Sequence, residues 1–123
     1  MFAAERIPSM ISRDMMDVSL VKKTMRVLPY DEAKEGIGRF VRDEVGDFDP
    51  PTAWDLSFEE YIETHKADKL LFCWYAKGVG MVFSPSDHHG IWGIRREGEM
   101  AKGLLPKFVI EVLEQVAKEK GLV

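Results

Sequence analysis

The most constraining feature of the sequence is an apolar stretch over residues 69–94 that turn-forming residues interrupt twice. It reads KLLFCWYAKGVGMVFSPSDHHGIWGI and is rich in the aromatic and β-branched residues that favour strands. The interruptions are Lys77-Gly78 and the run Ser84-Pro85-Ser86-Asp87, which are typical of tight turns. This pattern predicts three short strands joined as an antiparallel meander.

Helical patterns lie on both sides of this stretch. Residues 102–121, KGLLPKFVIEVLEQVAKEKG, predict a long amphipathic helix that ends at Gly121. Its predicted buried stripe comprises Leu105, Phe108, Val109, Val112, Leu113 and Val116. Two shorter helices are expected over 30–46, with Asp31 as the cap, and over 57–66, with Ser57 as the cap. Pro50 and Pro51 predict a loop between them.

The N-terminal part of the sequence is less regular. Residues 1–20 predict an arm or a short helix, and residues 21–29, VKKTMRVLP, predict a strand that ends at Pro29. A chain of 123 residues is suited to one core, so residues 21–123 are expected to form a single domain. The predicted fold class is α+β, with a mostly antiparallel sheet of about four strands and helices packed on it.

The charge distribution disfavours nucleic acid as a partner. Residues 31–68 carry twelve acids and four bases, a net charge of −8, whereas residues 1–30 and 69–123 each carry +2. An acidic middle third would repel a phosphate backbone. No apolar run approaches the roughly 20 residues of a membrane span, so no membrane partner is expected. The single Cys73 cannot form an internal disulfide, which suits a cytoplasmic location.

The predicted order of elements over residues 24–121 resembles the first two-thirds of the GCN5-related N-acetyltransferase fold. In that family the fourth strand leads into a Gln/Arg-x-x-Gly-x-Gly/Ala turn, whose amides and following helix bind the pyrophosphate of acetyl-coenzyme A. Arg95 and Gly98 match this pattern, and Met100 stands where glycine or alanine is expected. The resemblance implies acetyl-coenzyme A as a cofactor, held by Arg95, Gly98, Lys102 and Gly103.

Departures from the family pattern favour an alternative function. The chain ends at Leu122-Val123, where the family would begin a fifth strand, and residues 90–94 carry no acidic general base. The internal acetyltransferase-like proteins of some tailed-phage particles have a similar strand-to-helix region. The methionine-rich segment 10–21 is typical of a surface that docks on another subunit as well as of an ordinary first helix.

Two functions therefore stay open. The first is a truncated acyl-coenzyme A N-acyltransferase, with or without activity. The second is a non-catalytic interaction or structural protein that binds a protein partner or forms a homo-oligomer. The geometry of residues 95–103 is expected to discriminate between them.

The other chemically interesting residues have structural interpretations. Neighbouring side chains of Asp87-His88-His89 point to opposite faces of an extended segment, so no metal site is expected there. Cys73 is expected to be a small buried hydrophobe rather than a nucleophile. Gly78-Val79-Gly80 is expected to be a hairpin turn rather than a phosphate loop. Core or rim positions are expected for Trp54, Trp74, Tyr75 and Trp92.

Overall fold

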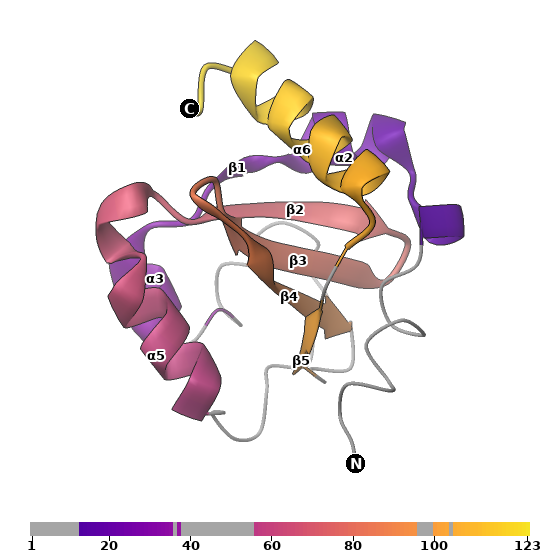
Figure 1. Cartoon of the computed structure of the whole chain (residues 1–123). Coiled ribbons are helices and arrows are strands. Elements are labelled where there is room, and N and C mark those ends of the chain that lie inside the picture. The colour runs from indigo at the N-terminus through magenta and orange to yellow at the C-terminus, as the bar shows by residue number, and fades with distance from the viewer. Residues whose placement is uncertain (1–12, 36, 38–55, 96–99, 104) are drawn as a thin grey trace.

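The fold is built on a five-stranded antiparallel sheet whose strands follow one another in chain order (Figure 1). The computed structural model describes residues 13–35, 37, 56–95, 100–103 and 105–123. The strands are β1 (Arg26–Val27), β2 (Leu71–Ala76), β3 (Val79–Ser84), β4 (Asp87–Arg95) and β5 (Met100–Gly103). The predicted three-stranded meander is confirmed as β2–β3–β4. At one edge β1 is the remainder of the strand predicted over residues 21–29, and at the other edge β5 was not predicted.

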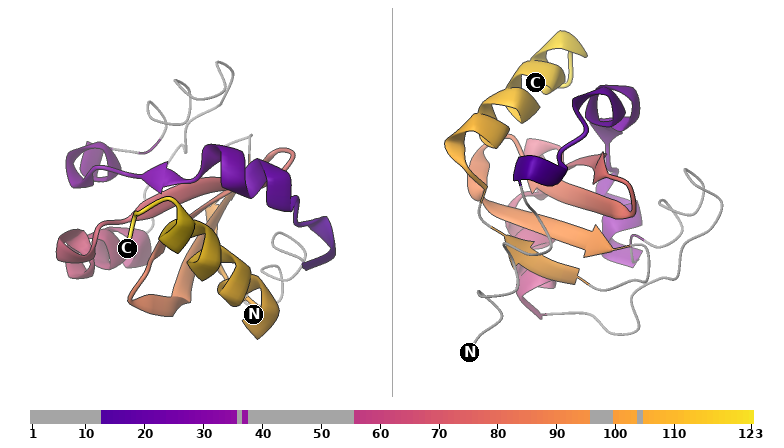
Figure 2. Two further views of the ribbon diagram at one scale, coloured as in Figure 1. Left: turned by 90° about the horizontal axis from the view of Figure 1, so that it is seen from above. Right: turned by 90° about the vertical axis from the view of Figure 1, so that its right-hand side faces the viewer.

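Helices cover both faces of the sheet. They are η2 (Arg13–Met15), α2 (Val18–Thr24), α3 (Tyr30–Glu35), α5 (Leu56–Thr64), η3 (Lys66–Asp68) and α6 (Lys107–Glu119). Helices α2 and α6 lie side by side on one face, and α3 and α5 lie on the other (Figures 1 and 2). The predicted α+β class is therefore confirmed, as three layers with the sheet in the middle.

Strand β2 shows why its sequence is apolar at every position. Cys73 and Tyr75 belong to the core under α2 and α6, whereas Phe72 and Trp74 belong to the core under α3 and α5. All six residues of the strand are buried. A strand that is covered on both faces has a continuous run of apolar residues, whereas a half-exposed strand alternates apolar and polar residues.

The predicted strand over residues 21–29 is wrong in its first half, which forms helix α2. The Asp17 carboxylate accepts the backbone N–H of Leu20 at 3.1 Å and so caps this helix. Val21 and Met25 are four positions apart, and both are buried against the sheet. Only Arg26 and Val27 remain as strand β1, which pairs with Leu71 and Phe72. The predicted end of the arm at residue 20 falls within α2, and residues 1–12 lie outside the described part.

The C-terminal helix begins later than predicted. Pro106 precedes it with φ −58°, and a residue without an N–H is well suited to a helix start. Gly121, with φ +72°, confirms the predicted helix stop. The buried stripe is confirmed for Val109, Leu113 and Val116, whereas Phe108 is 52% exposed and does not belong to it.

The two helices before the meander begin close to their predicted positions. Helix α3 starts at Tyr30, and α5 starts at Leu56, so Ser57 lies within α5 instead of capping it. The rest of the predicted helix over 30–46, apart from the buried Ile37, and the predicted Pro50-Pro51 loop lie outside the described residues. None of the helices in the described ranges has the length and hydropathy to cross a membrane.

Candidate functional site

Three of the four residues predicted to hold a cofactor can be placed. Arg95 is the partly buried last residue of β4. Lys102 and Gly103 lie on β5, where they pair with Trp92 and Ile91 of β4. Gly98 lies outside the described residues. Lys102 and Gly103 are thus part of the sheet, whereas the phosphate turn implied by the resemblance would place them at the start of the following helix.

The strand β5 was not predicted, and it changes the surroundings of this segment. Met100 and Ala101 also pair with β4, opposite Ile94 and Gly93. The polypeptide therefore returns antiparallel to β4 before it reaches α6 at Lys107. The strand-to-helix order expected from the sequence becomes a hairpin followed by a helix.

Cys73 is confirmed as a buried residue. Its side chain has no solvent exposure, and burial raises the pKa of the thiol. Burial likewise raises the pKa of Tyr75 to about 12, with a smaller contribution from the negative charge of Asp14. A thiol that stays protonated at neutral pH attacks poorly.

The remaining sequence candidates are mostly accounted for by packing. Trp74, Tyr75 and Trp92 are buried, as predicted. The predicted hairpin turn is confirmed at Gly78, which has φ +79° between β2 and β3, whereas Val79 and Gly80 belong to β3. The segment 87–89 begins β4, and its side chains lie outside the described part, as does Trp54.

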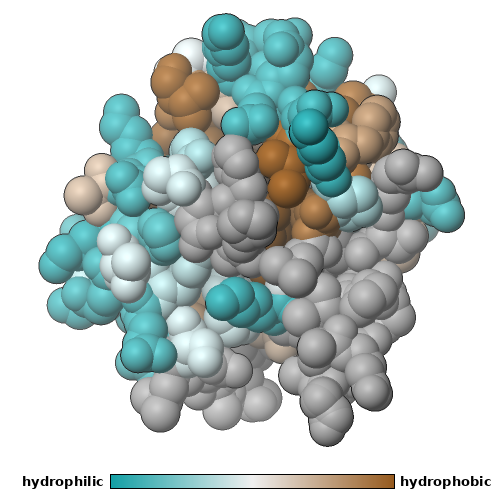
Figure 3. All heavy atoms as spheres, in the orientation of Figure 1, coloured by the Kyte–Doolittle hydropathy of each residue, from teal (hydrophilic) through white to brown (hydrophobic). Residues whose placement is uncertain are grey.

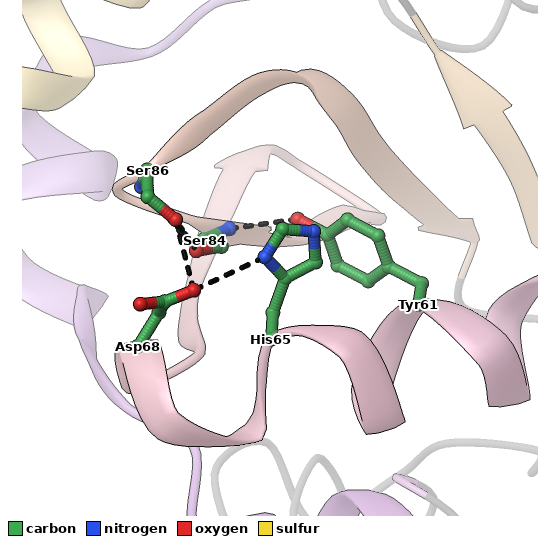
Figure 4. Close-up of polar contacts among 5 residues, drawn as sticks. All are labelled: Tyr61, His65, Asp68, Ser84 and Ser86. Atoms are coloured by element: carbon green, nitrogen blue, oxygen red, sulfur yellow. Dashed lines mark hydrogen bonds and ion pairs between the residues drawn. The ribbon is translucent and has the colours of Figure 1, made fainter.

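A polar cluster that the sequence analysis missed lies where α5 and η3 meet the turn between β3 and β4 (Figure 4). It consists of Tyr61, His65, Asp68, Ser84 and Ser86. The Ser86 hydroxyl donates to Asp68 Oδ2 at 3.0 Å, and His65 Nδ1 lies 3.3 Å from the same oxygen. The backbone N–H of the fully buried Ser84 donates to the Tyr61 hydroxyl at 2.8 Å. The cluster therefore fastens the α5–η3 segment to the sheet.

The order of groups in this polar cluster differs from that of a nucleophilic triad. A triad places the imidazole between the hydroxyl and the carboxylate, so that the imidazole can take the hydroxyl proton. Here Asp68 lies between His65 and Ser86 and binds both. The cluster is accordingly suited to hydrogen bonding at the surface, and the hydroxyl of Ser86 is not activated for attack by His65.

Two apolar grooves flank helix α6. The sheet groove, between α6 and strands β3 and β4, has a volume of about 290 Å³ and is lined by Phe83, Pro85, Ile91, Ile110, Leu113, Glu114, Ala117, Lys118 and Val123. The helix groove, between α2 and α6, has a volume of about 370 Å³ and is lined by Val18, Lys22, Phe108, Glu111, Val112, Gln115, Val116 and Glu119. Figure 3 shows brown, apolar surface between the teal side chains of the helical layer and the sheet.

Exposed apolar side chains gather in the helical layer formed by η2, α2 and α6. Met15 is 40% exposed, Val18 is 38% exposed and Phe108 is 52% exposed. Val18 and Phe108 face each other across the helix groove, since they come from its two walls. Side chains of this size in one region are typical of an interaction surface.

Comparisons of the chain with protein-family models, curated proteins and solved structures gave no match. Function is therefore inferred from the surface of this chain. The features that bear on it are the helix groove, the sheet groove and the polar cluster.

Proposed function

We propose that this chain is a non-catalytic interaction protein that associates through its helical layer. The observation that carries the proposal is the exposure of Val18 and Phe108, which line the helix groove, and of Met15 on η2, which precedes α2. Removing such side chains from water favours association by about 25 cal/mol for each Å² of apolar surface buried.

The charges of the helix groove favour a second copy of the chain as the partner. Lys22 on α2 and Glu111 on α6 both line the groove, and neither forms an ion pair within the described residues. A two-fold dimer would bring Lys22 of each copy to Glu111 of the other, because a two-fold interface uses the same patch twice. Phe108 of each copy would then pack into the groove of the other, against Val18 and Val112.

The oligomeric state tests this proposal directly. Light scattering over a range of protein concentrations should give twice the chain mass of 14.1 kDa for the wild type. Phe108→Ser should give the mass of a single chain, with an unchanged circular dichroism spectrum because the side chain is already more than half exposed. Val123→Ser is the matched control, since Val123 is 64% exposed but lies outside the helix groove.

A charge exchange tests the predicted pairing of Lys22 with Glu111. Lys22→Glu and Glu111→Lys should each be monomeric, because each variant brings like charges together twice in a two-fold dimer. An equimolar mixture of the two variants should restore the dimer, since opposite charges then meet at both contacts. A wild-type protein that is monomeric at every concentration, or a mixture that stays monomeric, would contradict the proposal.

An acyl-coenzyme A-binding protein, as a truncated N-acyltransferase, is the second candidate. The position of Arg95 at the end of β4 favours it, because the resemblance assigns a cofactor-binding arginine to that point. The exposed Lys102 on the adjacent β5 adds a second positive charge. Calorimetric titration with coenzyme A and acetyl-coenzyme A should show micromolar binding that Arg95→Ala and Gly98→Glu abolish. Absence of binding at millimolar ligand by the folded protein would reject this candidate.

We also propose a cytoplasmic location. Cys73 is fully buried and is the single cysteine of the chain, so folding does not require an oxidising compartment in which disulfides form. Fractionation of the source cells followed by immunoblotting would test it, and recovery from the extracellular medium would reject it.

A further inference from the structure

The sheet groove is hollow although core residues form its floor. Phe83, Ile91 and Leu113 are at most 4% exposed, yet they border a space of about 290 Å³. Protein interiors are normally packed as densely as organic crystals, so a space of this size among core residues is unusual. Apolar concave sites with a few polar groups at the edge are the common form of small-molecule sites.

One end of the sheet groove continues into a second hollow, here called the polar pocket. The polar pocket is lined by Ala67, Asp68, Lys69, Pro85, Ser86, Gly121, Leu122 and Val123. Pro85 and Val123 line both hollows, so the apolar groove and the polar pocket are contiguous. Asp68 and Ser86, which belong to the polar cluster of Figure 4, thus lie at the polar end of one elongated site.

Two carboxylates, of Asp68 and Glu114, and two ammonium groups, of Lys69 and Lys118, line this site. The Asp68 carboxylate is already engaged by His65 and Ser86, and Glu114 also interacts with another group of the chain. Lys118, at the edge of the sheet groove, and Lys69, in the polar pocket, form no ion pair within the described part of the chain. The two ammonium groups are therefore the charged groups that are left to contact a ligand, and a charge-assisted contact with them favours an anionic head group.

We infer that the sheet groove and the polar pocket together bind a single-chain anionic amphiphile, a fatty acid of medium length. Its alkyl chain lies in the sheet groove against Ile91 and Leu113, and its carboxylate lies between Lys69 and Lys118. At ~30 Å³ for each methylene group, which is also the volume that one molecule occupies in liquid water, the groove volume corresponds to about ten such groups. This site uses the flank of α6 opposite the helix groove, so it does not depend on self-association.

Calorimetric titration with three twelve-carbon amphiphiles tests the inference. Dodecanoate, dodecanol and dodecyltrimethylammonium, each below its micelle concentration, share one chain and differ in the charge of the head group. Dodecanoate should bind the wild type at least about tenfold more tightly than dodecanol, because it adds a charge-assisted contact, and dodecyltrimethylammonium should bind most weakly. Equal binding of the three, or no binding of dodecanoate, would overturn the inference.

Variants locate the binding on the protein. The double variant Lys69→Gln, Lys118→Gln changes exposed side chains and should weaken dodecanoate binding about tenfold while leaving dodecanol binding unchanged. Ala117→Leu fills the floor of the groove and should weaken both ligands. Lys77→Gln, an exposed lysine in the turn between β2 and β3 that lines none of these hollows, is the matched control and should change neither. A double variant that binds dodecanoate as tightly as the wild type would also overturn the inference.

Discussion

Replacing Gly80 by alanine should strain the core beneath α3 and α5. Gly80 lies on β3 opposite Trp74 of β2. A Cβ atom at this position would lie 2.8 Å from Cε1 and 2.9 Å from Cζ of Phe72. The Phe72 ring is fully buried and packs edge to face on Trp74, with ring centroids 5.6 Å apart. The ring therefore has little room to move away from an added methyl group.

The expected destabilisation follows from these distances. The shorter contact is about 0.7 Å inside the ~3.5 Å at which carbon atoms attract one another. Overpacking of this kind destabilises a protein by about 1–3 kcal/mol. Alanine loses less conformational entropy on folding than glycine, so in a strand it stabilises the folded state by about 0.5–1 kcal/mol relative to glycine. Because the Phe72 ring has little room to move, the cost of overpacking lies in the upper part of its range, about 2–3 kcal/mol, and Gly80→Ala should lower the free energy of unfolding by about 1–2.5 kcal/mol.

Urea unfolding followed by tryptophan fluorescence measures this difference, and a double-mutant cycle identifies its cause. Phe72→Leu makes room for the added methyl group, so the double variant should be more stable than the two single changes predict, by about 1 kcal/mol. Gly78→Ala is the control, since no atom lies within 4 Å of its added Cβ and its φ of +79° alone opposes alanine. Phe72→Leu should not reduce the destabilisation that Gly78→Ala causes. Additive effects at Gly80, or an unchanged midpoint for Gly80→Ala, would refute the reasoning.

Three further predictions concern single side chains. Tyr61→Phe removes the oxygen that accepts the hydrogen bond from the buried Ser84 N–H, so the free energy of unfolding measured with urea should fall by about 1–3 kcal/mol. An unchanged free energy would contradict the role of Tyr61 as an acceptor. Tyr30→Phe removes the hydrogen bond that Tyr30 donates to Glu63, which lowers the pKa of Glu63 and raises that of Tyr30. The wild type should therefore exceed this variant in urea midpoint above pH 4.5 and below pH 10.0, the ordinary pKa values of the two groups. The difference should disappear as the pH falls through the lowered pKa of Glu63 or rises through the raised pKa of Tyr30; a difference independent of pH would be inconsistent with the hydrogen bond. Cys73 should react with a maleimide only when urea unfolds the protein, and rapid labelling of the folded chain would show that the thiol is accessible.

The meander and the last helix were predictable because their signals are local. The turns of the meander carry glycine, proline and serine, and its strands carry aromatic residues at high density. In α6, the buried residues Val109, Leu113, Val116 and Ala117 repeat at helical spacing. Phe108 was assigned to the same stripe, but it lies one position before Val109 and thus about 100° around the helix, on the flank that faces α2.

The errors occur where a distant part of the chain decides the local structure. Residues 100–103, MAKG, have weak strand propensity, and they form β5 because β4 offers them a free edge. Residues 21–24 of α2 were predicted as part of a strand because Val21, Met25 and Val27 suit either state, and the packing of the helix on β2 decides the outcome. The bonds of the polar cluster that tie α5 and η3 to the sheet join residues 18 and 23 positions apart, so no short sequence pattern reveals them.

The junction between α2 and β1 is held by contacts from far along the chain, which bears on how the protein folds. The Thr24 hydroxyl oxygen accepts the backbone N–H of Trp74 at 2.8 Å, and Lys120 Nζ donates to the carbonyl of Met25 at 2.9 Å. These contacts close loops of 50 and 95 residues, whereas β2, β3, β4 and β5 each pair with a neighbour in the sequence. Because closing long loops costs more entropy, we expect the meander to form the folding nucleus and the N-terminal segment to dock late. Weakening the junction should accordingly speed unfolding while leaving the folding rate almost unchanged.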